Sequence, residues 1–237
     1  MNILEHITDS IYQSKKLLAI LLDPDKIQLQ NIALISEKIN EKADFIFVGG
    51  STVNVGATEK LVEALKKHTQ LPIVIFPGDY TQITDKADAI LFLSLLSGDN
   101  PEYLIYQQVK SVSKLKNSSL EIIPTGYILI DGGVETSVQK VSKTTPISQN
   151  DTRKIVDTAL AGQYAGKKLI YLEAGSGAEN SVNPAIIKKV KKELRIPLIV
   201  GGGIRTQQQL KNAYDSGADL VVVGTAFEEN NLWFDTI

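Results

Sequence analysis

Two glycine-rich segments near the C-terminus have the residue pattern of an anion-binding site. Gly201-Gly202-Gly203 follows the apolar run 198–200, and Gly224-Thr225 follows the apolar run 220–223. Short β-branched runs are typical of buried parallel strands, and glycines let backbone N–H groups approach a ligand closely. In an α/β barrel, the loops after the seventh and eighth strands commonly hold a phosphate group. The two segments therefore predict a phosphate-binding site.

A glutamate at the end of another apolar run is the strongest candidate for acid–base chemistry. Strand alternation over residues 169–173 places Tyr171 and Glu173 on one face, opposite Ile170 and Leu172. A carboxylate at the mouth of an apolar barrel is costly unless it is paired or used. We therefore expect Glu173 to accept a hydrogen bond from a substrate hydroxyl and to remove its proton. A salt-bridged structural glutamate is the alternative.

Two aspartates and a serine are candidate ligands for a hard cation. Asp23 and Asp25 follow the apolar run 17–22, and Ser51 follows the apolar run 45–48. Mg²⁺ takes one or two protein oxygens and completes its octahedron with water and phosphate oxygens. Capping of a helix is the alternative for the aspartates, because Asp-Pro-Asp is a common turn pattern before a helix.

All of these candidates follow short apolar runs, of which the chain has eight. Helix start signals lie between most runs, such as an Asn-Pro pair at Asn183 and a capping box over 206–209. Strands that alternate with helices pair in parallel through right-handed crossovers, and eight such units close into a barrel. The runs span residues 17–22, 45–48, 73–76, 89–93, 122–130, 169–172, 198–200 and 220–223.

We therefore predict an α/β fold consisting of a single (β/α)8 TIM barrel over residues 1–237, with a doubly wound sheet as the alternative. The length of 237 residues is close to the roughly 250 that are typical of this barrel. The barrel is modified around its third helix, because residues 77–86 are too few and too polar for a full helix. Residues 131–150, which are rich in Ser and Thr, predict a long loop or lid after the fifth strand.

The composition excludes several kinds of chemistry. The 25 basic and 27 acidic residues nearly balance, so no strong field favours nucleic acid or an anionic membrane as the main partner. The chain has no cysteine, which excludes disulfides and thiolate nucleophiles, and we expect His6 and His68 to be ordinary surface residues. No signal-peptide pattern and no long apolar run occurs, so we expect a cytoplasmic protein without stable membrane insertion.

Five motifs together resemble one known family. They are Leu-Asp-Pro-Asp-Lys at 22–26, Val-Gly-Gly-Ser at 48–51, Tyr-Leu-Glu-Ala-Gly-Ser-Gly-Ala at 171–178, Gly-Gly-Gly-Ile at 201–204 and Gly-Thr at 224–225. In this order and spacing, over nearly the full length, they resemble the geranylgeranylglyceryl phosphate synthases and their bacterial PcrB-type relatives. Gly-Gly-Gly-Ile by itself occurs in many phosphate-binding barrels.

The resemblance implies a Mg²⁺-dependent prenyltransferase that joins sn-glycerol 1-phosphate to geranylgeranyl diphosphate in an ether bond and forms homo-oligomers. It implies that Asp23 and Ser51 belong to the metal site and that Glu173 and Tyr171 are catalytic. Some bacterial members carry lysine two positions before the metal aspartate, whereas this chain has Leu21, which indicates the other major branch of the family. The implied glycerol-phosphate site consists of Tyr171, Leu172, Glu173, Ala174, Gly175, Ser176, Gly177, Gly202, Gly203, Gly224 and Thr225.

A prenyl chain requires an apolar groove, because burial contributes about 0.8 kcal/mol per carbon. No Asp-Asp-x-x-Asp motif occurs, which argues against a chain-elongating prenyl synthase. The residues leave the prenyl length open, for instance a heptaprenyl chain, because the length depends on how the groove is packed. Candidate wall residues are Leu91, Leu93, Leu95, Leu96 and Tyr127.

Two other functions remain as alternatives. A sugar-phosphate isomerase on the same kind of barrel would use Asp23 and Asp131 as its acid and base. Against this function, residues 77–78 after the third strand make a poor second phosphate loop. A non-catalytic phosphate-binding protein would bind glycerol phosphate without turnover.

Overall fold

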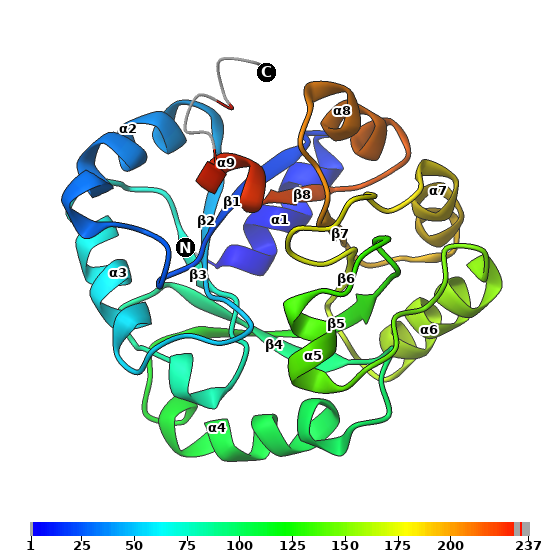
Figure 1. Cartoon of the computed structure of the whole chain (residues 1–237), viewed down its shortest axis with the longest axis horizontal. Helices are drawn as coiled ribbons and strands as arrows, with labels where there is room; N and C mark the ends of the chain where they lie inside the picture. Colours follow the sequence, from blue (N-terminus) through cyan, green and yellow to red (C-terminus); the bar gives the residue numbers. More distant parts are fainter. Residues whose placement is uncertain (1, 230–232, 234–237) are drawn as a thin grey trace.

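A closed barrel of eight parallel strands forms the centre of the protein, in strand order β1 to β8 (Figure 1). The structure, a computed structural model, describes residues 2–229 and 233. Pairing of Leu17 in β1 with Leu220 in β8 closes the ring. The predicted TIM barrel is confirmed. The strands are β1 (Leu17–Leu22), β2 (Phe45–Val48), β3 (Ile73–Ile75), β4 (Ala89–Leu95), β5 (Glu121–Leu129), β6 (Leu169–Glu173), β7 (Leu198–Gly201) and β8 (Leu220–Val223).

Helices surround the ring of strands, and each of the predicted start signals begins one (Figure 1). The Asn183 side chain accepts from the N–H of Ala185, and Thr206 and Gln209 form the predicted capping box. The α-helices are α1 (Ile3–Tyr12), α2 (Ile32–Lys42), α3 (Ala57–Leu65), α4 (Gln107–Leu115), α5 (Ser137–Ser142), α6 (Thr152–Tyr164), α7 (Pro184–Glu193), α8 (Gln207–Asp215) and α9 (Thr225–Glu229). The shorter helices are the 3-10 turns η1 (Leu29–Asn31) and η2 (Tyr80–Gln82) and the π-helix η3 (Glu102–Tyr106).

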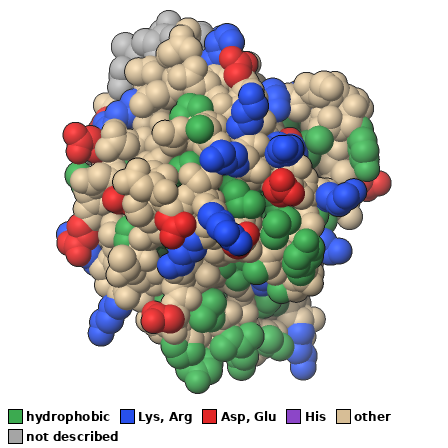
Figure 2. Space-filling view, turned by 90° about the vertical axis from the view of Figure 1, so that its right-hand side faces the viewer, with side chains coloured by type: hydrophobic (Ala, Val, Ile, Leu, Met, Phe, Trp, Pro, Cys, Tyr) green, Lys and Arg blue, Asp and Glu red, His purple; other side chains and the backbone are tan. Residues whose placement is uncertain are grey.

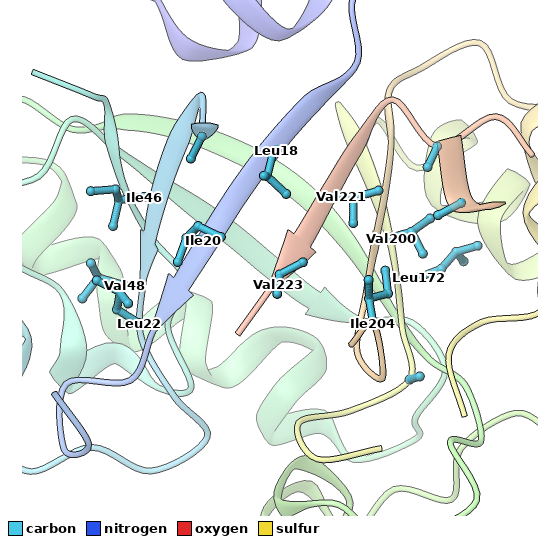
Figure 3. Packing of buried hydrophobic residues seen from close by; sticks show 14 of the residues in the cluster. Leu18, Ile20, Leu22, Ile46, Val48, Leu172, Val200, Ile204, Val221 and Val223 are labelled. Carbon is cyan, nitrogen blue, oxygen red and sulfur yellow. The ribbon is translucent and has the colours of Figure 1, made fainter. Parts of the chain in front are cut away.

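Strand alternation divides the buried side chains into two layers. One set points outward between the barrel and the helices, as Leu18, Ile20 and Val221 do in Figure 3. The other set fills the barrel interior and includes Phe47 and Tyr171. Because a side chain two residues further along a strand stays on the same face, Glu173 also faces the interior.

Helix α1 closes the amino-terminal end of the barrel. Its Ile3 and Ile7 are buried in the interior cluster. The Glu121 carboxylate, at the start of β5, accepts hydrogen bonds from the backbone N–H groups of Ile3 and Leu4. These N–H groups have no acceptor inside the helix, so Glu121 fixes the helix N-terminus against the sheet. The barrel interior is therefore filled from this end.

Two segments between strands depart from the regular repeat. The unit after β3 contains only the three-residue turn η2, as residues 77–86 predict. Residues 131–150 are not simply a loop, because they contain α5, which begins with a capping box between Thr136 and Gln139. A bridge between Ile130 and Ile147 holds the two ends of this segment together. Across the part of the chain that the structure describes, no helix is long and apolar enough to cross a membrane.

Candidate active site

A cavity of about 440 Å³ opens at the carboxyl ends of the strands. One part is polar and lies against the glycine-rich loops after β6, β7 and β8. The other part is apolar and extends along β3 and β4 toward η3 and α4. Most of the predicted site residues line this one cavity, namely Asp23, Ser51, Tyr171, Glu173, Gly175, Ser176, Gly177, Gly202, Gly203, Gly224 and Thr225.

The Glu173 carboxyl lies at the junction of the two parts and is 5% exposed. Its Oε1 accepts the N–H of Gly175 at 2.6 Å. Burial raises the pKa of Glu173 to about 7, against the smaller lowering effects of Tyr171 and of the Gly175 N–H. A carboxyl that titrates near neutral pH can accept a proton from a substrate and release it again. No basic side chain forms a salt bridge with it among the described residues, so the structural salt-bridge alternative is not supported.

The Tyr171 hydroxyl is the polar group next to Glu173. A Cβ atom at Gly201 would lie 2.3 Å from this hydroxyl and 3.0 Å from Glu173 Oε2. Both groups therefore lie against the backbone of Gly201, which has no side chain. The hydroxyl is near enough to lower the pKa of Glu173. It is nevertheless buried without a partner in ordinary hydrogen-bond geometry in the described part of the chain. A buried polar atom that borders a cavity and has no partner is suited to bind a ligand.

Aromatic rings surround this pair. The Phe76 ring stacks on Tyr171 with the centroids 5.3 Å apart, and the Tyr127 ring meets Tyr171 edge-on at 5.5 Å. Burial, and then the charge of Glu173, raise the pKa of both tyrosines well above the usual value. Both phenols are therefore neutral hydrogen-bond donors at physiological pH.

The loops after β6, β7 and β8 converge on the polar part of the cavity. Ser176 Oγ and Thr225 Oγ1 are 3.2 Å apart, which joins the first loop to the last. Gly202 has a φ of +80°, and a Cβ atom there would lie 2.4 Å from Glu173 Oε1. Only glycine therefore brings this backbone against the carboxylate without strain. The arrangement leaves backbone and hydroxyl donors around a space that can hold an anion.

The loop after β1 carries the candidate metal ligand Asp23. Glu228 in α9 holds this loop, because its Oε1 accepts the Asp23 N–H at 2.9 Å and its Oε2 lies 3.0 Å from Lys26 Nζ. The Asp23 carboxylate faces the neighbouring loop, since a Cβ atom at Gly50 would lie 3.2 Å from both of its oxygens. Asp25 instead accepts the N–H of Asn54, which supports a local structural role for this residue.

The donor set around Asp23 fits Mg²⁺. Across residues 2–229 and 233, no group of three or more His, Cys, Asp or Glu side chains could hold a metal ion. The set would therefore consist of the Asp23 carboxylate, the Ser51 hydroxyl, water and substrate oxygens. Mg²⁺ is usually bound in this way, through one or two carboxylates together with the phosphates of a substrate.

Four of the five predicted groove residues line the apolar part of the cavity. Leu91, Leu93, Leu95 and Tyr127 line it, and the prediction for Leu96 is wrong. Leu96 follows the end of β4 and packs against the outer core, near Gly126 and Gly162. Consecutive residues of an extended chain point to opposite sides, so Leu96 cannot share a face with Leu95.

Two predicted glycerol-phosphate residues, Leu172 and Ala174, have side chains in the core between barrel and helices. They can contact a ligand only through their backbone, and the Ala174 N–H already donates to Gly201. Asp131 is exposed, accepts the Gly133 N–H and is absent from the cavity lining. The acid–base pair that the isomerase alternative needs is therefore not assembled.

Several cavity residues were not identified from the sequence. Phe76, Tyr103 and Glu228 line the cavity, and the buried amide of Gln82 lies directly behind it. Phe76 lies at the end of the predicted third strand, and Glu228 lies in the segment after Gly224. Both are therefore close in sequence to segments on which the predictions rest. The signal for Gln82 is weaker, because a polar residue in a short segment without a helix pattern looks like surface.

The closed barrel and the cavity at the carboxyl ends of its strands define the protein as a TIM-barrel enzyme that binds its ligands at that end. The sequence profile described as the PcrB family matches residues 10–237, and the chain belongs to this family. The predicted family resemblance is confirmed.

Individual relatives agree with this assignment. The geranylgeranylglyceryl phosphate synthase of Zunongwangia profunda is 56% identical over 226 residues, which cover 95% of this chain and 97% of that protein. The synthase of the same description from Flavobacterium johnsoniae is 52% identical over 233 residues, covering 98% and 96%. The crystal structure of (S)-3-O-geranylgeranylglyceryl phosphate synthase from Thermoplasma acidophilum, in complex with its substrate sn-glycerol-1-phosphate, superposes with a TM-score of 0.93. It is 38% identical in sequence, and the match covers 100% of this chain and 95% of that one.

Proposed function

We propose that this protein is a geranylgeranylglyceryl phosphate synthase. It transfers the prenyl group of geranylgeranyl diphosphate to a hydroxyl of sn-glycerol 1-phosphate, forming an ether bond and releasing diphosphate. The observation that carries this proposal is the buried Tyr171–Glu173 pair, which lies between a cradle of glycine-rich loops and an apolar groove. A substrate pair with one phosphate, one nucleophilic hydroxyl and one long apolar chain matches these three features.

In the proposed reaction, the loops around Gly203, Gly224 and Thr225 bind the glycerol phosphate. The Tyr171 hydroxyl and the Glu173 carboxylate bind the glycerol hydroxyl. The C–O bond between the prenyl carbon and the diphosphate breaks with both electrons going to the diphosphate. The glycerol oxygen forms the new bond to this carbon, and its proton passes to Glu173. The pKa of about 7 suits Glu173 for this proton transfer.

Asp23 and Ser51 are proposed to hold Mg²⁺ at the diphosphate end of the prenyl substrate. When bound, Mg²⁺ would neutralise the negative charge that builds up on the leaving diphosphate. Leu91, Leu93 and Leu95 are proposed to contact the prenyl chain. The Phe76 and Tyr127 rings, which pack on Tyr171 and line the cavity, can shield the reacting carbon from water.

We also propose that residues 1–237 act as one prenyltransferase domain in the cytoplasm and that the protein is a homo-oligomer. One observation supports the oligomer. Hydrophobic side chains gather at the lower end of the surface in Figure 2, the end at which α4 lies in Figure 1. In this region the side chains of Ile105, Tyr106, Val109 and Val112 are about half exposed on one side of η3 and α4. Such a stripe is typical of a protein–protein contact.

Turnover of labelled sn-glycerol 1-phosphate with prenyl diphosphates of several lengths tests the proposal. We expect Mg²⁺-dependent formation of an ether product, with the highest kcat/KM for the geranylgeranyl substrate. A preference for heptaprenyl diphosphate would support the proposed reaction but show that the prenyl substrate is longer than proposed. Binding of glycerol phosphate without turnover with any diphosphate would instead support the non-catalytic alternative.

A further inference from the structure

The side chain of Gln82 connects two loops of the cavity that are far apart in the sequence. Gln82 ends the turn η2 and is 3% exposed. Its Nε2 donates to the carbonyl oxygen of Gly50 at 2.9 Å, in the loop after β2. Its Oε1 accepts the N–H of Gly78 at 3.2 Å, in the loop after β3, and a longer contact from the Gly50 N–H at 3.5 Å. One buried amide thus satisfies the backbone of both loops.

The two loops are also in direct contact at this point. A Cβ atom at Gly78 would lie 2.3 Å from the Gly50 carbonyl oxygen and 2.6 Å from that of Ser51. A side chain at this position would therefore displace the loop after β2. The short turn η2 stands where a regular barrel has a full helix, and it brings the Gln82 amide behind this contact.

The loop that Gln82 holds faces the candidate metal ligand. A Cβ atom at Gly50 would be 3.2 Å from the Asp23 carboxylate, and Ser51 follows directly in the lining of the cavity. Gln82 itself is absent from that lining, so it acts on this region only through the backbone that it binds. A shift of Gly50 would change the distance between the loops after β1 and β2.

We propose that Gln82 is a positioning residue that sets the loop of Gly50 and Ser51 against Asp23, and so forms the subsite for the diphosphate and its Mg²⁺. This inference rests on the proposed function. It predicts a selective effect, because Gln82 binds the loop after β2, which lies across the barrel from β6 and is separated from β8 by β1. Loss of the amide should weaken binding of the diphosphate with Mg²⁺ and leave binding of glycerol phosphate nearly unchanged.

The test measures both ligands by calorimetry in the parent and in Gln82→Met, which keeps the length of the side chain and removes its hydrogen bonds. The probes are inorganic pyrophosphate with Mg²⁺ and sn-glycerol 1-phosphate. Because the loop of Gly50 and Ser51 loses its side-chain partner, we expect Mg²⁺–pyrophosphate affinity to fall by about tenfold, equivalent to about 1.4 kcal/mol. Glycerol-phosphate affinity should stay within about twofold, a difference too small to indicate a lost hydrogen bond.

Gln149→Leu is the matched control. The Gln149 amide also joins loops, since it donates to Asp131 and Ser181 and accepts from Asn183, but it does not line the cavity. It should lower thermal stability without the selective loss. Gly78→Ala disturbs the same contact as Gln82→Met by a different route, and it keeps the test decisive if Gln82→Met does not fold.

Three outcomes would overturn the inference. They are unchanged Mg²⁺–pyrophosphate affinity in a folded variant of Gln82 or Gly78, equal losses for both ligands, and the same selective loss in Gln149→Leu. If the parent turns over prenyl diphosphates and the variants show any of these outcomes, the proposed function stands and only this inference is overturned. A parent that binds neither ligand would overturn both.

Discussion

At the scale of single residues, Glu173 owes its chemical properties to its surroundings. The side chain is buried at the inner face of β6, and burial raises its pKa from 4.5 to about 7. The Gly175 N–H and the Tyr171 hydroxyl partly oppose this rise. Near neutral pH the carboxyl is therefore balanced between its two forms. Two predictions test this balance.

The first prediction concerns turnover. Glu173→Gln keeps the size of the side chain and one acceptor oxygen but cannot take up a proton at neutral pH. The kcat should fall by about 100-fold or more if proton transfer limits the rate, because general bases contribute about 10² to 10⁴. The affinity for sn-glycerol 1-phosphate should change less, since other groups hold the phosphate. Steady-state kinetics and calorimetry measure the two quantities, and a kcat near that of the parent would exclude the base role.

The second prediction concerns pH. The folded pKa of about 7 lies above the ordinary value of 4.5, so the folded state binds the proton of Glu173 more tightly than the unfolded state does. The stabilisation from this group is complete below pH 4.5 and is lost as the pH rises through about 7. Thermal unfolding of the parent and of Glu173→Gln measures it. The stability of the parent relative to the variant should decline across this interval and level off above it, and a constant difference would contradict the raised pKa.

At the scale of elements, the site is a set of loops that follow parallel strands. The loops after β1 and β2 carry the candidate metal residues, and those after β6 to β8 form the candidate phosphate cradle. Side-chain contacts such as Ser176 to Thr225 and Asp23 N–H to Glu228 join them. Because the two sets of loops carry candidate ligands for different substrates, we expect a change in one set to affect one substrate more than the other.

Gly224→Val tests the phosphate cradle. A Cβ atom at Gly224 would have only ordinary contacts, the nearest being 3.5 Å from Leu21, so the backbone tolerates a side chain there. The valine methyl groups should instead occupy space that the phosphate needs. We expect glycerol-phosphate affinity to fall by about tenfold or more, equivalent to at least about 1.4 kcal/mol, with little loss of thermal stability. Unchanged affinity by calorimetry in the folded variant would show that the phosphate binds elsewhere.

Asp23→Asn tests the metal loop. The amide keeps an oxygen that can accept the Asp25 N–H but removes the negative charge that favours Mg²⁺. The Mg²⁺ concentration for half-maximal activity should rise and kcat should fall, while glycerol-phosphate affinity stays close to that of the parent. A Mg²⁺ titration of the kinetics measures this. If activity and Mg²⁺ dependence both match the parent, Asp23 serves only as a turn residue.

At the scale of the whole molecule, the barrel has two buried layers, and one of them leads to the site. The outward-facing residues pack under the helices, as Leu18, Ile20 and Val221 do in Figure 3. The inward-facing residues fill the barrel and lead up to Tyr171 and Glu173. The side chains of Ile105, Tyr106, Val109 and Val112 form an exposed apolar stripe, which supports self-association.

Val109→Asp tests this surface. Val109 is 62% exposed, so a carboxylate there costs little in a monomer but would be buried in a contact between copies. We expect the mass in solution, measured by light scattering after gel filtration, to shift to that of a smaller assembly. Val55→Asp is the control, because Val55 is 89% exposed in the loop before α3 and lies outside the stripe. An unchanged mass would mean that any oligomer uses another surface.

Local features of the chain were enough to predict the barrel, its eight strands and the starts of α7 and α8. Apolar alternation, an Asn-Pro pair and a capping box act over a few residues, so they are visible without the fold. The same reasoning predicted that most candidate residues lie close together, because all loops after parallel strands reach one end of a barrel. The prediction failed for Leu96, because β4 continues to Leu95, beyond the predicted end at residue 93. It also missed α5, which lies within residues 131–150.

The tertiary structure decided the properties that depend on distances between segments far apart in the chain. The sequence alone determined that Glu173 and Tyr171 share a face of one strand, since side chains alternate along a strand. It could not determine the raised pKa of Glu173, because burial is produced by surrounding strands and loops. Nor could it determine that Gln82 binds Gly50, 32 positions away, since a buried amide finds its partners only when the loops are packed.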